Sequence, residues 1–245
     1  MDCPKFNLSP QEATKIATFL GYGNPAAPVW FIGFEEGLGK MSDNEAMKNL
    51  KARGSFNSVM DLREAHLQLL EKGKQIDIEI DPPSTQVWRF MAKIMLARDG
   101  CKDWHTSKAA KQYVMKKLGR KGSDTFPGDT FLTELSPIPK GKNSDTRWMT
   151  EFEQCHANLG TEIESRRNQL GRLLKERASS PPLVICYGES KRAYFEELLQ
   201  VKWKPVYSGV HSTIDSKHLL LPFFGRGYMN KSLIAKLLDS GSLNP

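Results

Sequence analysis

The hydrophobic positions of this chain alternate between short continuous apolar runs and longer segments in which apolar residues recur every three or four positions. Continuous runs are typical of strands buried on both faces of a parallel sheet, and the periodic segments are typical of amphipathic helices. Four runs predict strands, at residues 29–33, 130–135, 183–187 and 218–224. A further short strand is expected at 204–207.

Helices are expected between these strands. The first has a clear start signal, because Ser9 precedes Pro10 and is followed three positions later by Glu12, the pattern of a capping box. The other helices are predicted from the spacing of their apolar residues, at 43–53, 58–72, 84–95, 105–118, 156–178, 189–199 and 228–239.

Strands that alternate with helices indicate the α/β class. We therefore expect one domain over residues 1–245, a three-layer sandwich in which a central, mostly parallel four-stranded sheet is flanked by helices. The helix at 156–178 carries charge on most of its faces, so it is expected to lie against solvent. Residues 116–122 form a basic loop that either faces a polyanion or is simply exposed.

The charge balance changes this picture by suggesting a partner. The chain has 35 lysines and arginines against 28 aspartates and glutamates, a formal net charge of +7, which favours a nucleic acid or another polyanion. No apolar stretch is long enough to cross a membrane and the first residues lack a signal-peptide pattern, so a cytoplasmic protein is expected. The cysteines are scattered, so neither a metal nor another cofactor is expected; they are Cys3, Cys101, Cys155 and Cys186.

Candidate chemistry gathers where the four strands end. The first strand ends in a glycine, two carboxylates and a second glycine, at Gly33, Glu35, Glu36 and Gly37. Glycines let the backbone turn tightly, and the carboxyl ends of strands are where open α/β sheets bind their ligands. The later strands end at 134–139, 187–189 and 224–228, and each of these turns has its own pattern of glycine, proline or charge.

The order of these strand ends resembles the uracil-DNA glycosylase superfamily. The segment 33–37 takes the place of that family's Gly-x-(Asp/Asn/Ala)-Pro-(Gly/Tyr) motif, and Phe56 that of the aromatic residue that stacks on the base. Glu134 stands in the place of the base-reading asparagine, and residues 184–190 resemble the turn after the third strand. The loop 221–228 takes the place of the final motif, which enters the minor groove. The resemblance covers residues 28–240 and rests on order and turn type more than on identities.

The resemblance implies a DNA repair glycosylase without a cofactor, expected as a monomer. It would extrude a damaged base from single- or double-stranded DNA and hydrolyse the N-glycosidic bond. Its base-binding residues would be Gly33, Phe34, Phe56 and Glu134. Glu35 would stabilise the oxocarbenium-like state and orient the water, Glu36 is the second choice for that role, and Arg226 would stabilise the departing base. The expected DNA contacts are Lys140, Lys142, Gly188, Lys191, Arg192, Phe224, Gly225, Gly227 and Tyr228.

Three departures from the family pattern stand out. Glu36 replaces the usual proline, and the final motif has no histidine unless His211 serves instead. Glu134 replaces an amide, and an ionised carboxylate accepts hydrogen bonds but donates none. It would suit the N3–H group of uracil and repel its O4 atom, whereas a protonated Glu134 would donate to O4 if burial raised its pKa. Uracil is ranked first, with hypoxanthine and an etheno adduct open.

Other interpretations remain open from the sequence. Phe56 is also a plausible core residue, Glu134 a partner of a lysine or buried arginine, and Glu35 and Glu36 helix caps. A non-catalytic module that recognises a flipped or abasic nucleotide is the main alternative function. A small-molecule α/β hydrolase of nucleosides is a third, which the basic charge balance does not favour.

Overall fold

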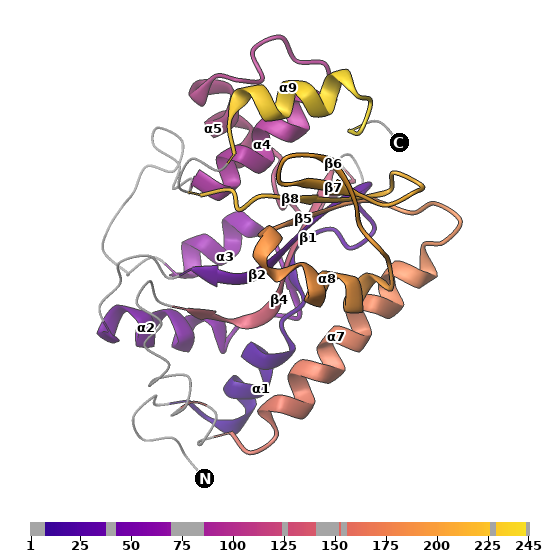
Figure 1. Cartoon of the computed structure of the whole chain (residues 1–245). Coiled ribbons are helices and arrows are strands. Elements are labelled where there is room, and N and C mark those ends of the chain that lie inside the picture. Colours follow the sequence, from indigo (N-terminus) through magenta and orange to yellow (C-terminus); the bar gives the residue numbers. More distant parts are fainter. Residues whose placement is uncertain are drawn as a thin grey trace.

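A single mixed sheet of eight strands forms the centre of the molecule. The computed structural model describes residues 8–37, 43–69, 86–123, 127–140, 152, 156–225 and 229–243 (Figure 1). The strands lie in the order β3-β1-β4-β2-β5-β8-β7-β6. Their bounds are β1 Gly21–Gly23, β2 Val29–Gly37, β3 Val59–Met60, β4 Thr130–Lys140, β5 Leu183–Tyr187, β6 Lys204–Tyr207, β7 Val210–Ser212 and β8 His218–Leu221.

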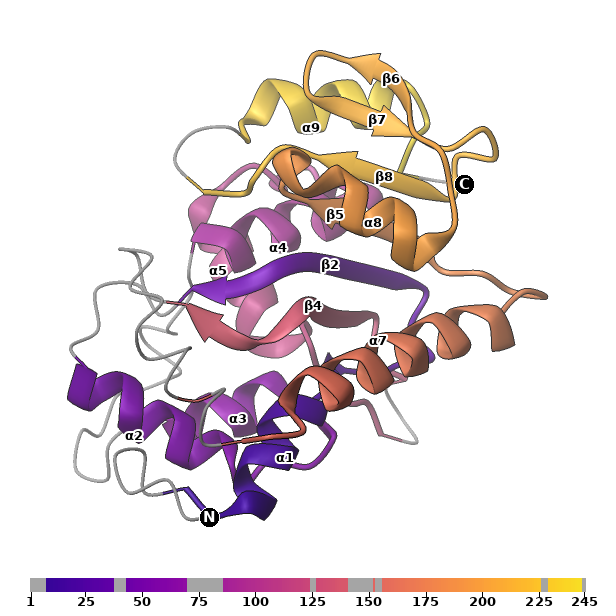
Figure 2. The same ribbon diagram turned by 60° about the horizontal axis from the view of Figure 1, so that its bottom comes forward.

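The four strands predicted from the apolar runs are the parallel centre of this sheet. β4, β2, β5 and β8 are neighbours and all run in one direction (Figure 2). The prediction of a four-stranded sheet was wrong in extent, because β1 and β7 add antiparallel pairings and β3 and β6 extend the two edges. β1 escapes detection because it consists of only Gly21, Tyr22 and Gly23, with no apolar run. The expected strand at 204–207 is present as β6.

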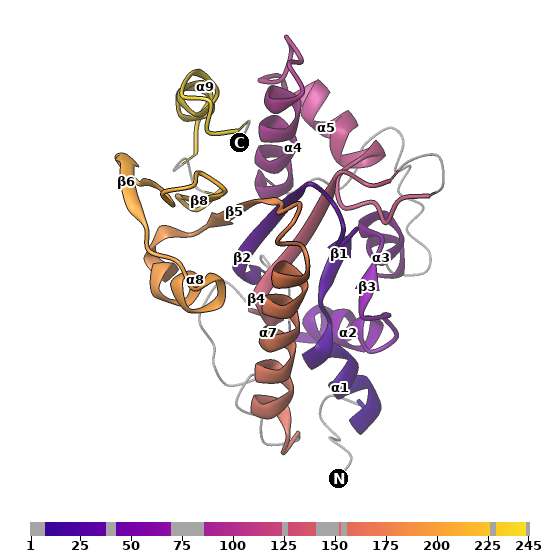
Figure 3. The same cartoon turned by 90° about the vertical axis from the view of Figure 1, so that its right-hand side faces the viewer.

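Helices cover both faces of the sheet (Figure 3). They are α1 Pro10–Thr18, α2 Asp43–Arg53, α3 Leu62–Leu69, α4 Gln86–Arg98, α5 Ser107–Lys116, α7 Leu159–Glu176, α8 Arg192–Leu199 and α9 Lys231–Asp239, with a 3-10 turn at Glu189–Lys191. The capping box that opens α1 is present, since Ser9 accepts from the Glu12 amide and the Glu12 carboxylate accepts from the Ser9 amide. No helix among the described residues is long and apolar enough to cross a membrane.

The side chains of β2 show how the two cores are divided. Val29 and Phe31 belong to the core beneath α4, α5 and α9, whereas Trp30 and Ile32 belong to the core beneath α7 and α8. This alternation follows from the pleat of a strand, in which successive side chains point to opposite faces. All four side chains are fully buried, which explains why the strand reads as a continuous apolar run.

The strand order determines where a ligand site is expected. From β2 the chain passes to β4 on one side and later to β5 on the other, so β2 and β5 flank the point where the direction of winding reverses. Loops diverge there and leave room at the carboxyl ends of the strands. Ile32 and Cys186 are a pair in register on β2 and β5, so the residues that follow them mark the expected site.

Candidate functional site

A hydrogen bond crosses over the carboxyl end of β2. Gly33 lies opposite Glu134 of β4, and Tyr187 is the last residue of β5 on the other side. The Tyr187 hydroxyl donates to Glu134 Oε1 at 2.5 Å, so the bond joins the two strands that flank β2. A Cβ atom at position 33 would collide with both Glu134 Oε2 and the Tyr187 hydroxyl. The structure thus brings together two predicted base-binding residues, Gly33 and Glu134, and adds Tyr187.

The carboxyl group of Glu134 holds a proton at neutral pH. The pKa of Glu134 is raised to about 8, chiefly by burial and also by the carboxylates of Glu36 and Glu35, while the Tyr187 hydroxyl and Arg166 lower it. Oε1 accepts from Tyr187, whereas Oε2 is buried and has no hydrogen-bond partner within the described residues. In the protonated form, a proton on Oε2 would be a donor without an acceptor among the described residues.

Glu36 is held by a buried arginine. Arg53 of α2 is 3% exposed, and its Nη2 atom lies 2.8 Å from Glu36 Oε1. The Tyr22 hydroxyl donates to Glu36 Oε2 at 3.2 Å, while Arg53 donates to the Tyr22 oxygen at 3.2 Å and to Asn49 Oδ1 at 2.6 Å. Although burial opposes it, the Glu36 carboxylate keeps the pKa of Arg53 above its ordinary value. The negative charge of Glu36 is thus paired within the protein, and its catalytic role stays a prediction.

Glu35 stays the better catalytic candidate. It lies opposite Ser136 of β4, just before the irregularity in strand pairing that separates it from Gly37. Its residue is half-buried, and its charge contributes to the raised pKa of Glu134. The position places one carboxylate beside a protonated one at the same strand edge. Two neighbouring carboxyl groups at one site are a common arrangement for acid and base roles.

A small cavity adjoins these groups. Its volume is about 40 Å³, and its lining includes Glu36, Arg53, Trp88, Glu134 and Arg166. A space of this size holds roughly one or two water molecules. A planar base would enter only if a lining side chain moved, and the half-buried Trp88 at the start of α4 is the largest of them.

Arg166 is a functional candidate that the sequence-based prediction missed, because α7 was expected to be solvated. Its side chain is buried, and the guanidinium donates to the carbonyls of Phe19, Leu20 and Leu135 and to the Thr133 hydroxyl. Burial lowers its pKa, but an arginine stays charged in proteins. The periodicity of the sequence indicates that Arg166 is buried, because position 166 continues the apolar stripe of α7. That stripe is made by Leu159, Ile163, Leu170 and Leu173.

Phe34 and Lys191, predicted on separate grounds, lie in contact. The Lys191 ammonium lies 4.4 Å from the centre of the Phe34 ring, and the Tyr194 ring centre lies 5.0 Å from it. Tyr194 is 44% exposed. Aromatic rings next to a lysine at an exposed edge are what proteins use to stack on unpaired bases.

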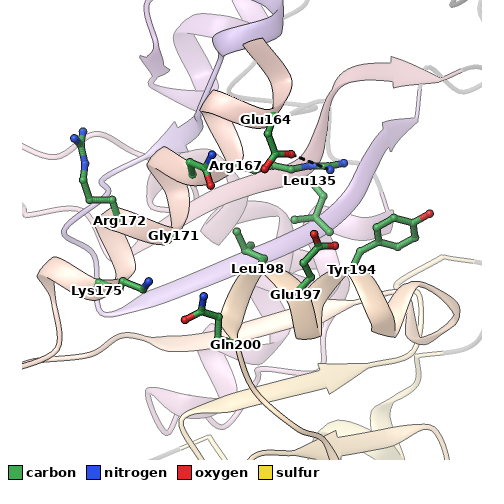
Figure 4. A pocket seen from close by; sticks show the side chains of 11 residues that line it. Leu135, Glu164, Arg167, Gly171, Arg172, Lys175, Tyr194, Glu197, Leu198 and Gln200 are labelled. Carbon is green, nitrogen blue, oxygen red and sulfur yellow. Dashed lines mark ion pairs between the residues drawn. The ribbon is translucent and has the colours of Figure 1, made fainter. Parts of the chain in front are cut away.

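A polar groove of about 450 Å³ lies between α7 and α8 beside Tyr194 (Figure 4). Its lining mixes charges of both signs. Arg167 pairs with Glu164 at 3.8 Å, and Glu197 faces the groove from α8. The near balance of charge makes this groove a poor match for a polyanion.

Other predicted residues are buried. Phe56 is 2% exposed and packs against Phe19, and Phe224 is fully buried and stacks on Tyr187 with ring centres 4.6 Å apart. The predictions that Phe56 stacks on a base and that Phe224 enters DNA were therefore wrong for this conformation, because both rings are part of the core. Gly225 is buried beside Phe224.

The remaining predicted contacts differ in how far the structure describes them. Gly188 adopts a left-handed conformation, φ 102°, which turns the chain out of β5. Arg192 is engaged within α8, since it pairs with Glu196 at 3.2 Å and donates to the Trp203 carbonyl. Lys140 ends β4, but its side chain is not described. Four predicted residues lie outside the described residues: Lys142, Arg226, Gly227 and Tyr228.

His211 lies near the same strand edge. It is 8% exposed, its Nε2 atom is 2.7 Å from Glu189 Oε1, and its Nδ1 atom is buried with no hydrogen-bond partner among the described residues. The pair packs at the end of β5 on the α8 side. Within the described ranges, no three side chains of the metal-binding types gather into a possible metal site.

Comparisons with known proteins found no significant similarity. No protein-family model matches the chain, and searches of curated proteins and of solved structures found no significant match.

Proposed function

We propose that this protein is a DNA N-glycosylase that excises a deaminated base bearing a carbonyl group, uracil first. The observation that carries the proposal is the buried Glu134 carboxyl in the middle of β4, whose pKa is raised by burial. Tyr187 fixes its orientation from one side, and its Oε2–H group lacks an acceptor within the described residues. A carbonyl oxygen such as uracil O4 is the acceptor that this donor would suit. An amino group at that position, as in cytosine, would meet a donor with another donor.

Glu35 supplies the second part of the proposed chemistry. Cleavage of an N-glycosidic bond develops positive charge on the sugar, and a nearby carboxylate stabilises that charge and orients the attacking water. Glu35 lies two residues beyond Gly33 on β2, opposite Ser136. Its carboxylate is close enough to raise the pKa of Glu134. Glu36 stays the second choice for this role, because its carboxylate forms an ion pair with Arg53.

A nucleic acid substrate is supported by charge and by the exposed ring of Tyr194, which lies beside the half-buried Phe34. The net charge of +7 favours a polyanion, and Phe34 and Tyr194 lie with Lys191 at the same edge of the sheet as Glu35. A base would reach Glu134 only with an opening of the small cavity.

The second candidate is a binding module of the same architecture without catalysis. It is favoured by the neutralisation of Glu36 and by a cavity of about 40 Å³, which as it stands admits water but no base. Such a module would bind DNA through the same edge and release no base.

One experiment separates the two. End-labelled oligonucleotides, single- and double-stranded, each carry one uracil, hypoxanthine or ethenocytosine, and alkali treatment before a denaturing gel reveals abasic sites. Excision of uracil by the wild type, its loss in Glu35→Gln and its retention in Glu36→Gln would support the glycosylase. Salt-sensitive binding with no excision of any base would support the binding module and overturn the enzyme.

A further inference from the structure

The positive charge of this protein is concentrated in one segment. Residues 86–123 contain ten lysines and arginines against two acids, Asp99 and Asp103, and so carry a formal charge of +8. The chain as a whole carries +7, so the other 207 residues together carry −1. The basic character of the protein is therefore a property of α4, α5 and the loop after α5.

The fold places this charge on an outer surface. α5 lies beside α4 at the outside of the helical layer (Figure 3). Its inner face is buried through Ala110, Tyr113 and Val114, and its outer face carries Lys108 and Lys116. The helix thus separates apolar and cationic positions around its axis, which leaves the lysines directed at solvent.

Four of these cations have no counter-charge within the described part of the chain. Two others are neutralised, Lys117 by Asp129 at 3.9 Å and Arg120 by Asp61 at 2.7 Å. The exposed side chains that form no ion pair with any described residue are Lys102, Lys108, Lys116 and Lys121.

The helix α7 provides a contrast. It is also rich in charge, but Arg167 pairs with Glu164, and Arg172 lies 3.6 Å from Glu176. A helix that neutralises its own charges is typical of a solvated face. The four exposed lysines of the α5 surface have no such partners among the described residues, so their charge is open to an anionic partner.

We propose that the outer face of α5 and the adjoining loops, through Lys102, Lys108, Lys116 and Lys121, bind the phosphate backbone of a nucleic acid. A membrane surface suits this region less well, because none of the large hydrophobic side chains exposed in the described structure lies in 86–123. Phosphates in a row match lysines spread along a helix and its flanking loops, and the contact would be independent of base sequence.

This surface is separate from the candidate site. The basic loop joins the beginning of β4, where the Gly119 amide donates to the Thr130 hydroxyl at 2.8 Å, while Glu134 lies further along the same strand. The inference does not rest on the proposed glycosylase activity, since a backbone contact needs neither a damaged base nor catalysis.

The test is a fluorescence anisotropy titration with undamaged single- and double-stranded 20-mers at several salt concentrations. The variant Lys108→Gln/Lys116→Gln is compared with Arg172→Gln/Lys175→Gln, which removes the same charge from exposed positions of α7. We expect the α5 variant to bind at least roughly tenfold more weakly than wild type near 100 mM salt and its salt dependence on duplex to fall by about 2 in log–log slope. The α7 control should change far less.

Equal losses in both variants would overturn the proposal, because net charge alone would then explain them. Unchanged binding in the α5 variant would overturn it as well, and so would a loss of binding to anionic vesicles without any loss to DNA. Circular dichroism of both variants shows whether the folds are intact. Since the probes carry no damaged base, failure of the proposed excision activity leaves this result unaffected.

Discussion

The Tyr187 hydroxyl donates to Glu134 across the backbone of Gly33, and this one bond ties β5 to β4 above the strand that separates them. It requires a residue without a side chain on β2, and it leaves the second oxygen of Glu134 buried. The geometry explains why a glycine stands at position 33 and, through burial, why the pKa of Glu134 is raised.

Replacing Glu134 by glutamine should change how stability depends on pH. The pKa of Glu134 is about 8 in the folded state and near its ordinary value of 4.5 in the unfolded chain. Between these values the folded state binds more protons, so wild-type stability should fall as pH rises from 4.5 to 8, by up to about 1.4 kcal/mol for each pH unit. The substituted glutamine does not titrate. Urea unfolding at pH 5 and pH 8.5 should show the Glu134→Gln variant gaining stability relative to wild type at the higher pH, and parallel pH dependences would contradict the raised pKa.

A methyl group at position 33 should be costly. Gly33→Ala places Cβ where Glu134 Oε2 and the Tyr187 hydroxyl now lie, so the hydrogen bond must break or the strands must shift. We expect a loss of about 1–3 kcal/mol in the free energy of unfolding. Gly160→Ala in α7 is the matched control, because a Cβ there meets no neighbouring atom, and it should be neutral or slightly stabilising. Equal free energies of unfolding for the two variants would show that position 33 can accommodate a methyl group.

The ion pair of Arg53 with Glu36 should matter far more to folding than exposed pairs do. Glu36→Gln leaves a buried guanidinium without its carboxylate, which should cost about 2–3 kcal/mol, reduced from the fully buried case because Glu36 is partly exposed. The exposed pair of Arg172 with Glu176 provides the comparison, and Glu176→Gln should change stability by less than about 0.5 kcal/mol. Thermal unfolding of both variants measures the difference, and similar melting temperatures would argue that Arg53 finds other acceptors.

The sequence predicted the parallel centre of the sheet because buried strands leave a continuous apolar run, as in Trp30, Phe31 and Ile32. It did not predict the edge strands, since Gly21 and Gly23 carry no side chains to form a pattern. The positions of Gly33 and Glu134 could be predicted from the order of the strand ends along the chain. The contacts of each acid could not be predicted, because Glu36 is bound by Arg53 and Glu134 by Tyr187, and these partners are distant in sequence.

The burial of individual side chains also could not be predicted from the sequence. From the sequence, Phe56 suited both stacking on a base and packing in the core, and in the structure it packs against Phe19. Arg166 is the opposite case, a charged residue that is buried. It lies on the apolar stripe of α7, where backbone carbonyls accept hydrogen bonds from its guanidinium. An apolar stripe interrupted by one arginine is a signal that can be sought in other charged helices.

The two acids that follow Phe34 should separate cleanly in kinetics. If Glu35 stabilises positive charge on the sugar, Glu35→Gln should lower the single-turnover excision rate for uracil by roughly a hundredfold or more and leave DNA affinity nearly unchanged. Glu36→Gln should retain excision to within about tenfold at a temperature where it is folded, because its carboxylate is already neutralised by Arg53. The pH profile adds an independent readout, since wild-type excision should decline above about pH 8 as Glu134 loses its donor proton, whereas Glu134→Gln should lack that decline. Loss of activity in Glu36→Gln with retention in Glu35→Gln would reverse the assignment and make the Arg53 pair part of the chemistry.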